Sequence, residues 1–276
     1  MLGVMVEPGR HNDGWKVPLR RLKHKALAWR WRRRVDMVLA AGELGRQWWC
    51  NAGFHPAQVV TFGYFVEIPD SGALGLVTGD REDTSVFRVI YVGSVNHPKA
   101  LDLVLEALAD IDGDWMLDII GSGPLEEVCR SFVAAHGMSA KVHWHGNRPN
   151  DEVIRRIAAS DLLVLPSRYD GWGAVVNEAL AVGTPVLVSS TCGAKDLVVT
   201  DLQGEVFPSE SVHGLRTALR RRMALGPVKC EQRERIRAWA AEAISPGAVA
   251  EYLIEVIRRA KSHQLAKVTP PWLLKV

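Results

Sequence analysis

Two carboxylate residues, Asp170 and Glu178, stand eight positions apart around a predicted helix start. Gly171 and Gly173 lie between them, and nearly all side chains from 174 to 182 are apolar, which is typical of a buried helix. The first amides of a helix have no intrahelical partner, and the helix dipole is positive there. Because a carboxylate accepts hydrogen bonds from two hydroxyl groups at once, this segment is suited to binding a polyol or an anion.

Each carboxylate also has a purely structural interpretation. Asp170 could only cap the helix, as short acidic side chains often do. Glu178 could pair with a cation of the core, because an ionised carboxylate without partners costs several kcal/mol to bury. The residue pattern alone leaves both interpretations open.

The elements that must position these residues follow from the alternation of the sequence. From residue 87 onward, short β-branched runs alternate with amphipathic stretches such as 100–109, 125–136 and 151–160. Connections of this length are too long for hairpins and indicate βαβ crossovers, with helices on both faces of a parallel sheet. We therefore predict the α/β class, a doubly wound, Rossmann-like domain, with strands at residues 88–92, 116–120, 142–145, 162–165 and 185–188.

Ligands of such a sheet bind beyond the carboxyl ends of its strands. The segment that contains Asp170 follows the fourth predicted strand, and its full context is a Pro-Ser pair, Asp-Gly-x-Gly and Glu-Ala-Leu-Ala-x-Gly-x-Pro-Val. This context resembles the Glu-x7-Glu signature of the family-four (group 1) retaining glycosyltransferases, with Asp170 in the first acidic position and Glu178 in the second. The resemblance extends over residues 35–199.

The resemblance implies a GT-B fold, in which two Rossmann-like domains face each other, and a nucleotide-diphosphate-sugar donor. It implies no metal and no other cofactor, and transfer with retention of configuration. By this resemblance Glu178 accepts from the ribose hydroxyls, while Asp170 and the amides of Gly171, Trp172 and Gly173 hold the donor sugar. Asp170 is one methylene shorter than the Glu that is usual in the family.

The loops after the first and third strands supply the other predicted donor-binding residues. Gly93 ends the first strand, and Lys99 resembles the family's phosphate lysine, whose charge neutralises the leaving diphosphate. Ser94 stands where the family has an arginine, so one cation is missing there. Arg148 lies near the position of the nucleotide base in the family, although it could equally be a surface arginine.

The organisation of the chain is predicted from the same patterns. Residues 1–70 contain too few βα units to bury both faces of a sheet, so we expect the end of an incomplete, acceptor-side N-terminal domain. Residues 71–85 are rich in Gly, Asp and Thr and are predicted to be a linker. Residues 86–245 form the predicted donor-binding domain, and residues 246–276 a last helix and tail that could pack back on the N-terminal part.

Composition excludes several classes of protein. The four cysteines stand far apart, without the spacing of a zinc site or a disulfide framework, which favours a reducing, cytoplasmic compartment. No signal peptide and no apolar run of about 18 residues is present. Gly121 and Gly123 lack the third glycine of a dinucleotide fingerprint, and His143 and His145 have no third metal ligand, so packing or hydrogen bonding is favoured for both histidines.

A basic segment, residues 15–34, contains nine Lys and Arg residues and three tryptophans without an acidic residue. Such a segment can lie on an anionic membrane, because the cations meet lipid phosphates while indole rings settle among the headgroups. A solvated helix face is the alternative, and nucleic acid is not expected because no binding motif accompanies the charges. We predict a protein that is peripheral at the inner face of the membrane.

The predicted function is transfer of a sugar from a nucleotide sugar to an envelope lipid or polysaccharide acceptor. An inactive donor-binding module is one alternative, because the Gly-rich loop and acceptor-side residues of the family's first domain are missing. A GT-B-type nucleotide-sugar epimerase is another, disfavoured by the resemblance of the acidic segment to a transferase signature.

Overall fold

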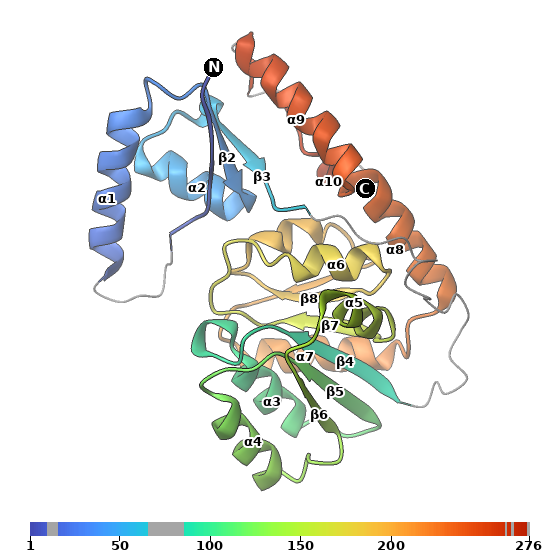
Figure 1. Ribbon diagram of the computed structural model, residues 1–276. Helices are drawn as coiled ribbons and strands as arrows, with labels where there is room; N and C mark the ends of the chain where they lie inside the picture. The colour runs from blue at the N-terminus through green and yellow to red at the C-terminus, as the bar shows by residue number, and fades with distance from the viewer. Residues whose placement is uncertain (10–15, 66–85, 263, 266–267, 275–276) are drawn as a thin grey trace.

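Two parallel β-sheets form the centre of the molecule (Figure 1). This computed structural model describes residues 1–9, 16–65, 86–262, 264–265 and 268–274. The predicted linker, residues 71–85, therefore lies outside the described residues, and the domain limits that depend on it stay predictions.

The larger sheet has six strands in the order β6-β5-β4-β7-β8-β9, and every neighbouring pair is parallel. Chain order runs outward in one direction from β4 and in the other from β7, so these neighbours mark the switch point of a doubly wound sheet. The fold class predicted from the sequence is confirmed. The strands are β4 (Phe87–Val92), β5 (Trp115–Ile120), β6 (Val142–Gly146), β7 (Leu162–Leu165), β8 (Val186–Ser189) and β9 (Gly204–Phe207).

Helices cover both faces of this sheet, as Figure 1 shows. Alternate strand residues point to opposite faces, so Val89 and Tyr91 pack with one group of helices while Ile90 packs with the other. The first group is α3 (Leu101–Ala109), α4 (Glu126–Ala135) and α7 (Val212–Ala224), and the second includes α5 (Asn150–Ala158), α6 (Val175–Ala181) and α8 (Cys230–Ala243).

The smaller sheet has the order β1-β2-β3 and is also parallel. Its strands are β1 (Gly3–Val6), β2 (Met37–Ala41) and β3 (Val59–Phe62), joined by α1 (Lys16–Trp31) and α2 (Gly42–Ala52). One face packs on these two helices, with Val38 and Trp48 in the core. The other face, which includes Leu39 and Phe62, joins the core of the larger sheet.

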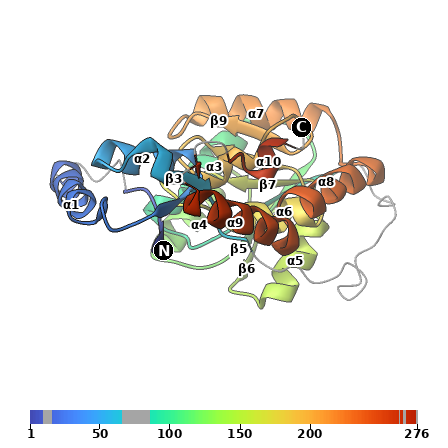
Figure 2. The same ribbon diagram turned by 90° about the horizontal axis from the view of Figure 1, so that it is seen from above.

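The long helix α9 (Pro246–Lys261) returns from the larger sheet to the smaller one. Tyr252 donates a hydrogen bond to the carbonyl oxygen of Thr61 at 2.8 Å, and its ring stacks on Phe62. Figure 2 shows α9 beside β3 when the molecule is seen from above. The two sheets are thus held together by the last long helix as well as by their shared core.

The loops that follow β4 and β5 approach each other too closely for side chains between them. Gly121 has φ +127°, and a Cβ atom at this position would overlap the carbonyl oxygen of Gly93. Gly123 approaches the backbone of Val95 in the same way. The glycines that resemble part of a dinucleotide fingerprint therefore serve the packing of two loops, one of which leads to Lys99.

Replacing Gly121 with Ala should lower the free energy of unfolding by about 2 to 5 kcal/mol, because left-handed strain and backbone overlap add together. Gly137→Ala is the matched control, since Gly137 also has positive φ but open space around it. The control should cost only about 1 to 2 kcal/mol. Urea unfolding measures both values, and equal losses would show that the close approach of the two loops carries no cost.

Candidate functional site

An ion pair joins the two loops that leave the sheet at its switch point. Lys99 Nζ lies 2.6 Å from Asp170 Oδ2, and the side chain of Asp170 is only 13% exposed. Lys99 follows β4 and ends a short 3-10 helix, η2 (His97–Lys99), whereas Asp170 follows β7. The structure therefore brings together two of the residues that the sequence predicts for the donor site, although they are 71 positions apart along the chain.

Backbone and side-chain hydrogen bonds hold the Lys99 loop in place. Asn96 caps η2, because its side-chain oxygen accepts from the amide of Lys99 at 3.1 Å. Arg168 ties this loop to the loop after β7: its amide donates to Pro98 O at 2.9 Å, and its guanidinium group bonds Asp102 and the carbonyl oxygen of His97. These hydrogen bonds stabilise the turn from which Lys99 faces Asp170.

Asp170 does not cap a helix, so the structural interpretation of this residue is wrong. Helix α6 begins at Val175, its capping residue is Ala174, and no side chain bonds the first amides of the helix. The Asp170 carboxylate pairs with Lys99 instead, and its backbone carbonyl accepts from the amide of Gly193 at 3.2 Å. The Asp170 carboxylate therefore lies at the carboxyl end of the sheet and makes a charged contact there.

Glu178 lies in the middle of α6 and is half-buried. Burial raises the pKa of its carboxyl group above the ordinary value, because the charged form loses hydration. Within the described part of the chain no cation pairs with this carboxylate, so the core ion pair is not found among these residues. Glu178 is instead an acceptor group whose hydrogen bonds a ligand can supply.

The segment between the two carboxylates contains a buried tryptophan and two glycines with special backbone or packing requirements. The Trp172 indole is buried and donates to Asn177 Oδ1 at 2.8 Å, and the carbonyl oxygen of Trp172 accepts from the amide of Ala194 at 2.8 Å. Gly173 has φ +97°, a left-handed conformation that favours glycine. A Cβ atom on Gly171 would lie 2.6 Å from the carboxyl carbon of Glu7.

The other predicted residues lie less centrally. Gly93 directly follows β4, and the exposed Ser94 follows it, with its carbonyl oxygen accepting from Tyr91. Arg148 follows β6, the edge strand two places from β4, and its side chain lies 3.7 Å from Glu152 on α5. Its contact with a nucleotide base stays a prediction.

Glu7 is a candidate site residue that the sequence did not reveal. It directly follows β1 in the smaller sheet, and its carboxylate lies against Gly171 of the larger domain. Tyr64 bonds this carboxylate, and burial together with that bond raises the pKa of Tyr64 to about 12. A four-residue strand carries little pattern, but once β1 is assigned, the position after its carboxyl end becomes the place to search.

A tyrosine and a cavity mark the boundary between the smaller sheet and the Asp170 loop. The Tyr169 hydroxyl donates to the carbonyl oxygen of Pro8. A cavity of about 320 Å³ opens here, lined by residues of both parts, among them Glu7, Tyr169 and His24. Groups from the two parts therefore meet at Tyr169, the residue that directly precedes Asp170.

His145, discounted above as a metal ligand, has a structural partner. Its Nε2 atom lies 2.5 Å from Asp118 Oδ1 on the neighbouring strand β5. The hydrogen-bonding interpretation of His145 is confirmed, and this pair belongs to the far side of the sheet from β7.

Residues 80–243, more than half of the chain, match the family described as glycosyl transferases group 1. The chain belongs to this family. It is 31% identical over 134 residues to the lipopolysaccharide 1,6-galactosyltransferase of Salmonella typhimurium. The matched residues cover 46% of this chain and 36% of that protein. The Escherichia coli lipopolysaccharide 1,6-galactosyltransferase is 27% identical over 196 residues, 69% of this chain and 53% of its own length. The matched part thus spans between a third and about half of these relatives.

Solved structures show the same fold at low sequence identity. The apo form of the lipopolysaccharide outer core galactosyltransferase WaaB has a TM-score of 0.70 at 20% identity, covering 83% of this chain and 62% of that one. Anabaena HepE in complex with UDP has a TM-score of 0.75 at 15% identity, with 93% and 72% covered. The GT-B architecture expected from the sequence is confirmed.

Glu178 provides a test that separates a ligand-binding role from a structural one. Replacing it with Ala should weaken binding of a nucleoside diphosphate such as UDP by about 1.5 to 3 kcal/mol, the range for hydrogen bonds to a charged group. Glu251→Ala, on the exposed side of α9, is the control and should leave the affinity unchanged. Isothermal titration calorimetry measures both.

The stability of Glu178→Gln should depend on pH in a defined direction. A raised folded-state pKa means that the group stabilises the fold below its unfolded pKa and that this contribution is lost as pH rises through the folded pKa. The neutral variant should therefore be more stable than the wild type at about pH 7, and the difference should vanish below about pH 4. A variant that is less stable at neutral pH would point to a structural ion pair.

Proposed function

We propose that this chain carries the donor site of a glycosyltransferase that moves a sugar from a nucleoside-diphosphate sugar to a saccharide or lipid-linked acceptor. The observation that carries the proposal is the Lys99–Asp170 pair at the switch point of the sheet, in a chain of the group 1 family. UDP sugars are the first donors to test, since HepE structures contain UDP and UDP-glucose.

Each residue has a distinct role in this proposal. Lys99 exchanges part of its contact with Asp170 for the diphosphate and offsets the charge that grows as the diphosphate leaves. Asp170, freed in part from Lys99, accepts from donor-sugar hydroxyls, and the amides of residues 171–173 donate to oxygen atoms of the donor. Glu178 accepts from the ribose hydroxyls, which supply the donors that its carboxylate lacks.

The reaction replaces one bond at the anomeric carbon with another. The bond to the diphosphate oxygen breaks, a bond to an acceptor hydroxyl oxygen forms, and the proton of that hydroxyl passes to an oxygen of the leaving diphosphate. Glu7 lies on the acceptor-side sheet against Gly171, so it is placed to orient the incoming hydroxyl. Retention of configuration and independence from metal ions belong to the same proposal.

The acceptor is proposed to be an envelope lipid or polysaccharide. Two relatives are named for lipopolysaccharide, and the exposed face of α1 supplies a physical reason for a membrane-bound substrate. Leu19, Leu22 and Trp29 lie on that face and are 58%, 66% and 73% exposed, opposite the buried Ala28. Lys23, Lys25 and Arg30 lie beside them and are exposed as well.

Membrane attachment would therefore be peripheral and at the cytoplasmic face. Of the three tryptophans in the predicted segment, Trp29 is exposed and Trp31 is half-buried, while Trp15 lies outside the described residues. No helix in the described parts of the chain is long and apolar enough to cross a bilayer.

Calorimetry with UDP and GDP tests the donor site. The wild-type chain should bind at least one of them, and excess EDTA should leave the affinity unchanged because Lys99 offsets the diphosphate charge. Lys99→Ala should weaken binding by about 1.5 to 3 kcal/mol, whereas the exposed Lys229→Ala should have no effect. Absence of heat for both nucleotides at millimolar concentration would remove the donor site, and loss of affinity in EDTA would contradict metal independence.

Vesicle co-sedimentation tests the membrane contact of α1. The full chain should pellet with phosphatidylglycerol vesicles at low salt and less at high salt, but not with phosphatidylcholine, because each cation near the surface contributes about 1 kcal/mol. Leu22→Ser with Trp29→Ser should reduce pelleting several-fold. Leu225→Ser with Ile254→Ser, two exposed apolar residues elsewhere, should not. Equal and negligible pelleting at both salt concentrations would favour a soluble acceptor.

A further inference from the structure

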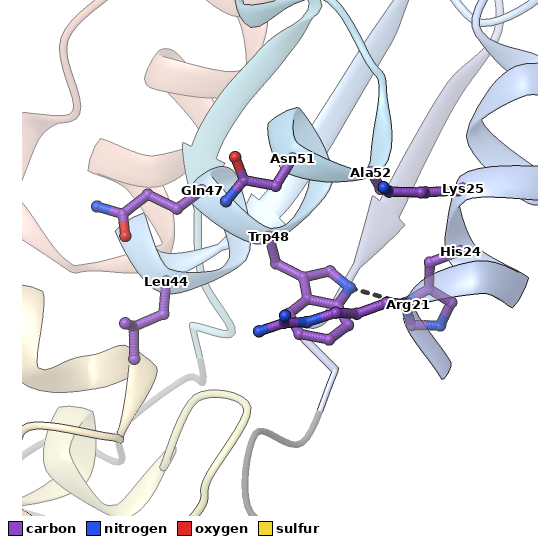
Figure 3. A pocket seen from close by; sticks show the side chains of 8 residues that line it. All are labelled: Arg21, His24, Lys25, Leu44, Gln47, Trp48, Asn51 and Ala52. Atoms are coloured by element: carbon purple, nitrogen blue, oxygen red, sulfur yellow. Dashed lines mark hydrogen bonds between the residues drawn. The ribbon is translucent and has the colours of Figure 1, made fainter. Parts of the chain in front are cut away.

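A second cavity, of about 310 Å³, lies between α1 and α2 (Figure 3). Arg21, His24 and Lys25 line it from α1, and Gln47, Trp48 and Asn51 line it from α2. Figure 3 shows Arg21 and His24 projecting from α1 toward the Trp48 ring. No acidic residue lines this cavity, and all its polar side chains can donate hydrogen bonds.

Arg21 and Lys25 give the cavity an uncompensated positive charge. They are one helical turn apart, where like charges repel, and both are exposed. In the part of the chain that the structure describes, neither forms an ion pair with a carboxylate. The Arg21 guanidinium lies over the Trp48 ring, 6.0 Å from its centroid, which restrains its position. An anion between the two cations would relieve their repulsion.

His24 adds a directed hydrogen-bond donor. Trp48 Nε1 donates to His24 Nδ1 at 2.6 Å, so the ring proton of the neutral histidine is on Nε2. Burial, then the charges of Lys23 and Arg20, lower the pKa of His24, which keeps it neutral. The ring also stacks on Trp49, with centroids 4.7 Å apart. The indoles of Trp48 and Trp49 thus fix both the tautomer and the orientation of His24.

The cavity adjoins the candidate donor site through His24. This histidine also lines the cavity that contains Glu7 and Tyr169, and Tyr169 directly precedes Asp170. A ligand that spans the two cavities would have one end beside Glu7 and the Asp170 loop and the other between Arg21 and Lys25.

We propose that the α1–α2 cavity binds a phosphate group of the acceptor, with Arg21 and Lys25 as counter-charges and His24 as a fixed donor. The acceptor would therefore be a phosphorylated saccharide, whose reacting hydroxyl lies toward Glu7. The identification of the phosphate with the acceptor rests on the proposed function, whereas the anion site itself rests on the cavity. A volume of about 310 Å³ accommodates a sugar unit with its phosphate and not only a single ion.

Calorimetry with soluble probes tests this site. Glucose 6-phosphate, inorganic phosphate and dihexanoyl phosphatidylglycerol below its micelle concentration are titrated into the full chain, with glucose as the neutral reference. Glucose 6-phosphate should bind, and glucose should not. Replacing both Arg21 and Lys25 with Gln should lower the affinity for glucose 6-phosphate at least tenfold. The control replaces Lys23 and Arg30 with Gln, which removes two cations of the same helix outside the cavity. This control should change the affinity for glucose 6-phosphate less than twofold.

The donor site provides the second control. Lys99→Ala should leave the affinity for glucose 6-phosphate intact, and Arg21→Gln with Lys25→Gln should leave UDP binding intact. UDP that fails to bind while the phosphate probe binds normally would contradict the proposed function and not the anion site.

Three results would overturn the inference. The first is that no phosphate probe binds at millimolar concentration. The second is that the Lys23 and Arg30 control loses as much affinity for glucose 6-phosphate as the Arg21 and Lys25 variant. The third is that the Arg21 and Lys25 variant keeps the wild-type affinity. Tighter binding of inorganic phosphate or of the soluble lipid than of the sugar phosphate would overturn the assignment to the acceptor, and would identify a free anion or a lipid headgroup as the ligand.

Discussion

The ion pair between Lys99 and Asp170 is the contact on which the candidate site depends. At the switch point of the larger sheet, the chain leaves β4 and β7 toward opposite faces, so no main-chain ladder joins the two loops. The ion pair and the contacts of Arg168 join them instead. Because the lysine is held by a capped turn and the aspartate by the backbone next to Gly193, the charges keep their positions without a ligand.

The electrostatic state of the site differs between its two carboxylates. Asp170 is paired, whereas burial raises the pKa of Glu178, and the structure describes no cation beside it. A nucleotide sugar would complement both conditions, since its diphosphate competes for Lys99 while its hydroxyl groups supply the donors that Glu178 lacks. The same buried carboxylate that costs stability in the free protein can therefore strengthen binding.

The sequence predicted five of the six strands of the larger sheet because βαβ units repeat a strong pattern. Five strands and the helices between them followed from it, but β9 and β1 did not. The pairing of Lys99 with Asp170 could be expected from strand order and the family resemblance. Glu7 could not, because its position depends on how the smaller sheet packs against residues far away in sequence. Whether Asp170 capped a helix also required the observed start of α6.

The placement of Glu7 depends on contacts that are distant from it. Tyr252 of α9 donates to the backbone of β3, and Asp196 of the larger domain accepts from the amide of Glu43 at the start of α2, at 2.5 Å. Burial raises the pKa of Asp196, so the amide is an important partner for its charged form. Together with the bond from Tyr169 to Pro8, these contacts fix the smaller sheet from several directions. The smaller sheet and the Asp170 loop therefore meet at Gly171, and the position of Glu7 is set by the interface between the two sheets as much as by the residues next to it.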